Sequence, residues 1–247
     1  MIIFFSATGN CKYVAQRISD AIGQKFISVT DCIQRNIYEF TDDITVIISP
    51  TYFWGLPSIV ADFLKKSKVR TEYLCFIATY GTTPGASGYI ADRLIEGKKI
   101  DAFYSVRMAD TWTPVFDLST SEKVSRFTRT TESDIDDIIT KIQSEYHNRK
   151  MKRSVPVFMA DLFAQPIYNN SARKTEKFSV NEQCIGCGLC SMKCPVKAIE
   201  MKNKKPVWVA DKCVMCLGCL HRCPVFAINY GKKTQKHGQY TNPYVKT

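Results

Sequence analysis

One cysteine pattern occurs twice in this chain and constrains its fold more than any other feature. The pattern Cys-x2-Cys-x2-Cys-x3-Cys-Pro begins at Cys184 and again at Cys213, a constant offset of 29 residues. The match extends past the cysteines, because the Ala-Ile pair at 198–199 recurs at 227–228. The repeat therefore predicts one small folding unit that is used twice.

The spacing of the cysteines predicts iron–sulfur ligation. Two residues between successive cysteines place three thiolates on one tight loop around a single [4Fe-4S] cube, and the fourth must come from elsewhere. The run resembles that of bacterial ferredoxins, in which the fourth cysteine of each run ligates the other cluster. The resemblance implies a small α+β two-cluster ferredoxin domain at 176–231. It implies two [4Fe-4S] clusters, the first held by Cys184, Cys187, Cys190 and Cys223 and the second by Cys213, Cys216, Cys219 and Cys194.

A zinc site and a disulfide framework are the alternatives. Structural zinc also uses Cys-x2-Cys pairs, although three evenly spaced cysteines plus a fourth before proline, in duplicate, favour clusters. The chain has 11 cysteines, an odd number, and Met1–Phe5 is too short and lacks the basic residues of a secretory signal. We therefore expect a cytoplasmic, reducing setting and no membrane association.

Charge divides the chain into two halves. Residues 1–147 hold 16 Lys and Arg against 18 Asp and Glu, whereas residues 148–247 hold 18 against 5. A basic excess of this size would steer an acidic redox partner to the cysteine half. The alternative is a solvated face that offsets cluster charge. We expect no nucleic-acid binding, because no reader motif is present and the lysines are dispersed.

The N-terminal half alternates apolar runs with helical patterns. It predicts an α/β domain over 1–150 with a doubly wound, parallel, five-stranded sheet covered on both faces. The last helix shows an apolar face that includes Ile135, Ile142 and Tyr146. Ligands of such sheets bind beyond the carboxyl ends of the strands. The expected strands are 2–5, 26–29, 44–49, 73–79 and 100–108.

Three of the loops at this edge of the sheet suit a flavin. The first offers the hydroxyls of Ser6 and Thr8, the flexible Gly9 and a helix N-terminus, which together fit a phosphate. The loops after the third and fourth strands supply two flat aromatic rings beside glycines, in Trp54-Gly55 and Tyr80-Gly81. A phosphate site together with two such rings fits a mononucleotide with a large planar ring. The two aromatic side chains could instead cap a hydrophobic edge or a partner interface.

These loops carry a family resemblance. Ser6-x-Thr8-Gly9-Asn10 after a first strand and Pro50-Thr51-Tyr52-x-Trp54-Gly55 after a third resemble the flavodoxin family, whose members bind FMN. With the cysteine half and a basic tail at 232–247, the whole chain resembles flavodoxin–ferredoxin fusions. The resemblance implies that Gly55 lets its loop flip as the flavin is reduced. It implies a phosphate loop of Ser6, Thr8, Gly9, Asn10 and Cys11, and a ring site of Thr51, Tyr52, Trp54, Gly55, Tyr80 and Gly81.

Cys11 departs from the family pattern, which has Thr or Ser there. A thiol is a poor hydrogen-bond donor, so one phosphate contact is missing. Cys11 is expected to be an inert replacement, with a reactive thiol at the helix N-terminus as the alternative. His147 and His237 are expected to be solvated. We expect a surface position for His221 as well, with a hydrogen bond that tunes its cluster as the alternative.

The join at 151–175 is too apolar for a flexible linker. A helix from about Pro156 that ends before Pro166 fits this segment. Its large apolar residues are expected to be buried, either at the seam between the domains or in the core of one domain. Both arrangements predict a rigid relation between the two halves.

The function expected from these features is electron transfer between two [4Fe-4S] clusters and FMN, with donor, acceptor and direction open. A flavin-dependent reductase of a quinone or nitro compound is an alternative, although no Gly-x-Gly-x-x-Gly nicotinamide motif is present. An iron–sulfur redox sensor or scaffold without FMN is another. An anaerobic host is expected, because the clusters are expected to be sensitive to oxygen.

Overall fold

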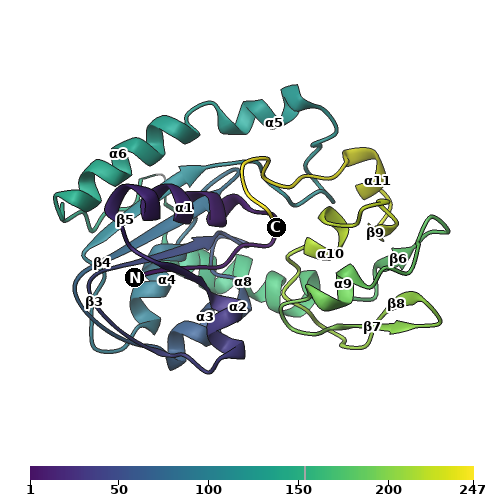
Figure 1. Cartoon of the computed structure of the whole chain (residues 1–247), viewed down its shortest axis with the longest axis horizontal. Coiled ribbons are helices and arrows are strands. Elements are labelled where there is room, and N and C mark those ends of the chain that lie inside the picture. The colour runs from purple at the N-terminus through teal and green to yellow at the C-terminus, as the bar shows by residue number, and fades with distance from the viewer. Residues whose placement is uncertain (153) are drawn as a thin grey trace.

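The computed structural model describes residues 1–152 and 154–247. A five-stranded parallel sheet forms the centre of the N-terminal half, in the order β2-β1-β3-β4-β5 (Figure 1). The order reverses between β1 and β3, and a reversal of this kind creates the crevice where ligands of doubly wound sheets bind. The expected flavodoxin-like fold is therefore confirmed. The strands are β1 (Ile2–Phe4), β2 (Phe26–Ser28), β3 (Glu39–Pro50), β4 (Lys68–Tyr80) and β5 (Ala102–Arg107).

Strands β3 and β4 begin earlier than the sequence pattern predicts. Residues 39–42 of β3 pair with residues 68–71 of β4, outside the apolar runs that predicted the strands. Each segment alternates exposed and buried residues: Glu39 and Lys68 are exposed, whereas Phe40 and Val69 are buried in the core beside the sheet. Backbone pairing holds them in the sheet, and hydrophobic pattern alone does not reveal such pairing.

Helices cover both faces of the sheet (Figure 1). α1 (Asn10–Ile22) and α6 (Thr131–Gln143) pack on one face, and α3 (Ser58–Lys66) and α4 (Ser87–Leu94) pack on the other. The short helices α2 (Val29–Gln34) and α5 (Ser121–Thr128) were not expected.

α6 buries the isoleucines that predicted it, with one exception at its end. Ile135, Ile138 and Ile142 are buried. Tyr146 lies beyond the end of the helix and its side chain is 57% exposed, so its assignment to the buried face was wrong.

The connecting segment forms one continuous helical stretch and does not end before Pro166. It runs through α7 (Val157–Met159), a π-helical turn at Ala160–Ala164, α8 (Gln165–Ile167) and a second π-helical turn at Tyr168–Ala172. Pro166 has no N–H to donate and stands at the start of α8, directly after a π turn, where the hydrogen-bond ladder is already shifted. Arg153, within the expected segment 151–175, lies outside the described residues.

Four large apolar side chains of this segment are exposed, contrary to the expectation that they would be buried. The face of the helical stretch that packs on the protein consists of Ala160, Ala164 and Tyr168, which are buried. Tyr168 lies at the seam, where its hydroxyl donates to Val214 O (2.7 Å) in the cysteine half and accepts Ser58 N–H (3.2 Å) in the sheet half. The exposed large residues are Phe158, Leu162, Phe163 and Ile167, at 54–66% exposure.

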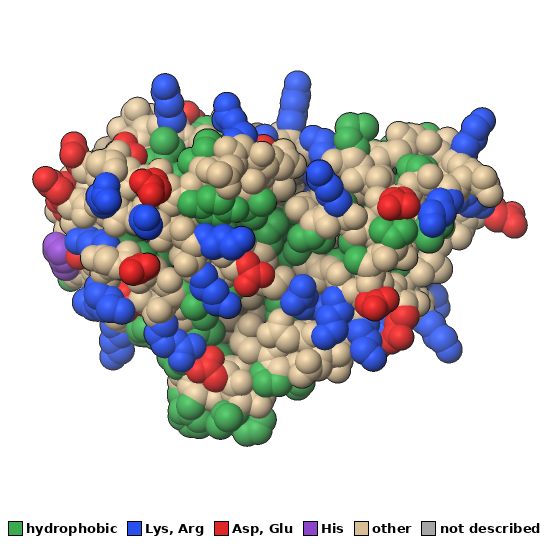
Figure 2. Space-filling model, turned by 90° about the horizontal axis from the view of Figure 1, so that it is seen from below, with side chains coloured by type: hydrophobic (Ala, Val, Ile, Leu, Met, Phe, Trp, Pro, Cys, Tyr) green, Lys and Arg blue, Asp and Glu red, His purple; other side chains and the backbone are tan. Residues whose placement is uncertain are grey.

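The cysteine half consists of two small antiparallel sheets and short helices. β6 (Phe178–Val180) pairs with β9 (Ile228–Tyr230), and β7 (Ile199–Lys202) pairs with β8 (Lys205–Trp208). Basic side chains are spread over this half in the view from below (Figure 2). Val214 is buried within the hydrophobic cluster of the sheet half, so the two halves share a core. The helices are α9 (Leu189–Met192), α10 (Gly218–His221) and, in the tail, α11 (Thr234–His237).

Among the helices that the structure describes, none is long and apolar enough to cross a membrane.

Candidate functional site

The loop between β1 and α1 is shaped to bind an anion. Gly9 caps α1 in the left-handed conformation (φ 98°), and its N–H donates to Ser6 Oγ (3.1 Å). The first turn of α1 contains no acidic residue, so the positive end of the helix dipole is not offset locally. Ser6 and Thr8 line the adjoining pocket, as the phosphate assignment requires.

Asn10 contributes to this loop differently from the expectation. Its side chain has protein partners at both ends: Nδ2 donates to Ala109 O (3.1 Å), and Oδ1 accepts from Tyr240 Oη (3.0 Å) and Asn242 Nδ2 (3.3 Å). These bonds fix the loop against the rest of the protein. What Asn10 offers a phosphate directly is its backbone N–H.

Cys11 is a buried thiol at the base of the same loop. Its Sγ lies 3.1 Å from Thr79 Oγ1 at the end of β4. Burial raises the pKa of this thiol to about 12, with the contact to Thr79 acting in the opposite direction. The thiol therefore stays protonated at physiological pH, which favours the inert interpretation over the reactive one.

A pocket of about 350 Å³ opens beside this loop, a size in the range of small-molecule sites. Loops from four strand ends line it. Gly9 and Gly55 do not, because each faces another part of the protein. The expected residues that do line the pocket are Ser6, Thr8, Asn10, Cys11, Thr51, Tyr52, Trp54, Tyr80 and Gly81.

The turn after β3 is strained and is held by the Gln165 side chain. Phe53 and Trp54 both have positive φ (47° and 61°), which costs on the order of 1–2 kcal/mol for each side chain. Gln165 Nε2 holds the turn by donating to Tyr52 O and Phe53 O (3.0 Å each). Strain of this kind persists where the surroundings fix it, and it gathers at functional sites.

Gly55 is needed here for space. A Cβ at this position would overlap the Gln165 amide. The carbonyl of the Trp54–Gly55 peptide accepts Ala86 N–H at 2.7 Å. The peptide flip expected on flavin reduction would break that bond, and the flip itself stays a prediction.

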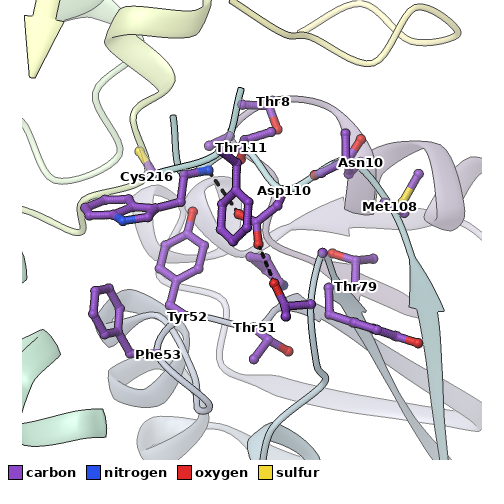
Figure 3. Close-up of a pocket in the computed structure, with 18 of the residues that line it drawn as sticks. Thr8, Asn10, Thr51, Tyr52, Phe53, Thr79, Met108, Asp110, Thr111 and Cys216 are labelled. Carbon is purple, nitrogen blue, oxygen red and sulfur yellow. Dashed lines mark hydrogen bonds between the residues drawn. The ribbon is translucent and has the colours of Figure 1, made fainter. Parts of the chain in front are cut away.

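The segment after β5 completes the pocket and was missed in the sequence. Asp110 and Thr111 face the cavity from this side (Figure 3). Asp110 accepts the Trp112 N–H (3.1 Å), and burial raises the pKa of its carboxyl. Gly81 has no room for a side chain, because the Asp110 side chain occupies that space. The rule that ligands bind at strand ends could have found this segment, since residues 108–112 follow the fifth strand.

The eight cysteines of the two runs surround two cavities. Cys184, Cys187, Cys190 and Cys223 line one, and Cys194, Cys213, Cys216 and Cys219 line the other. Each cavity is thus lined by three cysteines of one run and the fourth cysteine of the other run, and these are the two expected ligand sets.

Details around the thiols suit iron–sulfur clusters. Backbone N–H groups donate to Cys194 Sγ from Ala198 (3.3 Å) and to Cys223 Sγ from Ala227 (3.3 Å), bonds that stabilise thiolates. Within residues 1–152 and 154–247, no three His, Cys, Asp or Glu side chains converge as ligands of a single metal ion. The four thiols that line each cavity match in number the four ligands of a [4Fe-4S] cube.

Cys216 lies at the meeting point of the two kinds of site. It lines the second cysteine cavity and also the pocket at the sheet edge. Figure 3 shows it entering the pocket on the side of Tyr52 and Phe53. Its neighbour Met215 also lines the pocket. No pattern in the sequence indicated these contacts, because they depend on how the halves pack together.

His221 is buried, contrary to the expected surface position. Its Nε2 lies 2.8 Å from Thr111 O in the pocket loop, and its Nδ1 accepts the Tyr240 N–H (3.2 Å). Burial lowers the pKa of His221 to about 4, so the ring is neutral and Nε2 carries the proton. His237 is half-buried, with Nδ1 2.6 Å from Thr113 O, so it is not fully solvated. His147 is exposed as expected.

The fold and these sites define a two-domain redox protein. A family model of a flavodoxin domain matches residues 1–137, and a model of a 4Fe-4S dicluster domain matches residues 177–224. The chain belongs to the flavodoxin-domain family, as a fusion of that domain with a ferredoxin domain. Its role lies in redox or electron-transfer chemistry.

Solved structures show distant likeness. A flavoprotein in complex with FMN from Lactobacillus acidophilus NCFM is 15% identical, with 42% of this chain and 90% of that chain covered and a TM-score of 0.30. A flavodoxin from the domain Archaea is 12% identical, with 57% and 96% covered and a TM-score of 0.31. A flavone reductase is 12% identical, with 85% and 81% covered and a TM-score of 0.36. At these scores the likeness carries no functional argument. A comparison with curated proteins found no match.

Proposed function

We propose that this protein transfers electrons between two [4Fe-4S] clusters and one FMN. The observation that carries the proposal is the position of Cys216, which lines both the second cysteine cavity and the pocket at the sheet edge. When bound, the clusters would supply one-electron chemistry and FMN one- or two-electron chemistry. At Cys216 the two sites therefore share one lining residue.

The residues of the pocket have distinct roles in this proposal. Ser6 and Thr8 would donate hydroxyl hydrogen bonds to the phosphate, and the start of α1 would offset its charge. Trp54 and Tyr80 would lie beside the flavin ring. Asp110 brings a half-buried carboxyl to the same pocket, and its partial burial raises the pKa of that carboxyl.

The first cysteine set is the exchange point with an external partner. Cys187 is exposed, and the neighbouring Ile185 and Met192 are 65% and 75% exposed. Gly186 packs against Lys204, in the exposed turn between β7 and β8, and Lys205 follows it. Apolar contacts beside exposed basic groups suit an acidic one-electron carrier protein, which charge would steer to this surface. Eight thiolate ligands require a reducing compartment, which we take to be the cytoplasm.

Cofactor analysis tests the proposal. Protein purified without oxygen should contain about eight iron, eight sulfide and one FMN per chain. On stepwise reduction with dithionite, the clusters should pass electrons to FMN within the same molecule. Four iron per chain, or iron without flavin, would overturn the relay. Rapid reduction of a quinone by protein whose clusters have been removed would favour the reductase alternative.

A further inference from the structure

The C-terminal tail connects the two cofactor regions. After α11, the chain leaves the ferredoxin half and ends beside the start of α1, where the phosphate loop lies (Figure 1). Tyr240 and Asn242 are only 8% and 4% exposed, although they lie within eight residues of the C-terminal Thr247. A tail that is buried in this way is part of the fold.

At the flavin end, the tail holds the phosphate loop. The N–H of Asn242 donates to Thr8 O (2.7 Å), and the Tyr240 hydroxyl and Asn242 amide both donate to Asn10 Oδ1. Gly9 is packed against the same segment, so that a Cβ there would lie 2.8 Å from Asn242 Cβ. Three consecutive residues of the expected phosphate loop therefore contact the tail.

At the cluster end, the tail is tied to the second cysteine run. Gln239 Nε2 donates to Leu220 O (2.6 Å) and to Cys223 O (2.8 Å), and Cys223 belongs to the first ligand set. The Tyr240 N–H donates to His221 Nδ1 (3.2 Å). Residues 239–242 thus bridge the backbone around the cluster ligands and the loop that would hold the phosphate.

We propose that Tyr240 and Asn242 are positioning residues for the FMN phosphate, and that through them the ferredoxin half controls flavin affinity. The proposal rests on the function proposed above. A phosphate site built from backbone N–H groups binds tightly only when the loop is already in its bound shape, since ordering it during binding costs free energy. Asn10 anchors the loop to Ala109 on one side and to the tail on the other. Without its bonds to Tyr240 and Asn242, the Asn10 side chain keeps only its bond to Ala109 O among the hydrogen bonds described above.

Comparison of FMN with riboflavin provides the test, because riboflavin lacks the phosphate. The variants are Tyr240→Phe and Asn242→Ala, measured by flavin fluorescence on protein with intact clusters and its flavin removed. We expect about tenfold weaker FMN binding and unchanged riboflavin binding. Tyr244→Phe is the matched control: that ring is 71% exposed, contacts Tyr13 and should leave both affinities unchanged.

The outcomes separate the two proposals. If wild-type protein binds no FMN, the relay fails and this inference fails with it. Wild-type protein that prefers FMN to riboflavin would leave the relay standing. If Tyr240→Phe and Asn242→Ala then keep that preference, or lose affinity for both flavins equally, only the positioning role is overturned. Gln239→Ala touches no pocket residue and should still weaken FMN binding by about threefold if the tail acts as one unit. An unchanged FMN affinity in this variant would overturn control by the ferredoxin half.

Discussion

The two cysteine loops have the same ligand spacing and opposite surroundings. Ile185 in the first loop is 65% exposed, whereas its counterpart 29 residues later, Val214, is 1% exposed. Met192 is 75% exposed, and its counterpart His221 is 4% exposed. The repeat therefore determines the ligands, while packing determines the role: one loop faces solvent and the other faces the flavin pocket.

The backbone shows the same contrast. Gly186 and Gly188 adopt positive φ (69° and 75°), and their counterparts Met215 and Leu217 adopt nearly the same conformation (57° and 52°). A side chain in this conformation costs about 1–2 kcal/mol. The second loop tolerates that cost because Met215 and Leu217 are buried at 3% and 2% exposure, which offsets it.

The largest expected effect comes from removing one ligand in each loop. Cys187→Ala and Cys216→Ala should each lower the iron content from about eight to about four per chain. Only Cys216→Ala should also slow FMN reduction by the remaining cluster, by about tenfold or more, because the cluster next to the pocket is lost. Iron analysis and stopped-flow flavin absorbance measure the two effects. Equal flavin kinetics in the two variants would remove the distinction between an outer and an inner loop.

The second-largest effect is expected on the stability of the folded protein, when a residue of one cysteine loop is replaced by its counterpart from the other loop. Leu217→Gly relieves strain but removes a buried side chain, so we expect a net loss of about 2 kcal/mol. Gly188→Leu places a side chain in nearly open space, at 4.0 Å from Met201 Cγ, and should cost about 1 kcal/mol from strain alone. The temperature at which visible cluster absorbance is lost measures both. A larger loss in Gly188→Leu would show that packing does not offset the strain in the second loop.

Charge reversal at the outer loop should give a smaller, salt-dependent effect. Lys204→Glu with Lys205→Glu should lower the rate of cluster reduction by an acidic two-cluster ferredoxin by about tenfold at low salt. The difference should shrink at high salt, and direct reduction by dithionite should stay unchanged. Lys65→Glu with Lys66→Glu on α3 is the control, far along the chain on the sheet half. If both pairs slow the reaction equally, overall charge rather than this surface steers the partner.

The sequence predicted what depends on local pattern and missed what depends on packing between distant segments. Periodicity and turn chemistry predicted the parallel sheet and the loop at Ser6–Asn10, and the resemblance to bacterial ferredoxins predicted both cysteine sets. They could not reveal that Cys216 reaches the flavin pocket. The position of His221 was mistaken for the same reason, because its burial depends on Thr111 and Tyr240, more than 15 residues away in either direction.

The smallest expected effect is the alkylation of Cys11, whose thiol should be much less reactive than the thiols of the cysteine loops. Its pKa of about 12 leaves a thiolate fraction of only about 10⁻⁴ at pH 8, and its Sγ is buried against Thr79. Iodoacetamide at pH 8 should therefore leave Cys11 unmodified in the folded protein and alkylate it fully after unfolding, as peptide mass spectrometry would show. In protein stripped of iron, exposed Cys187 should react first. Alkylation of Cys11 at a rate close to that of Cys187 would mean that the phosphate loop opens, and that the tail does not hold it closed.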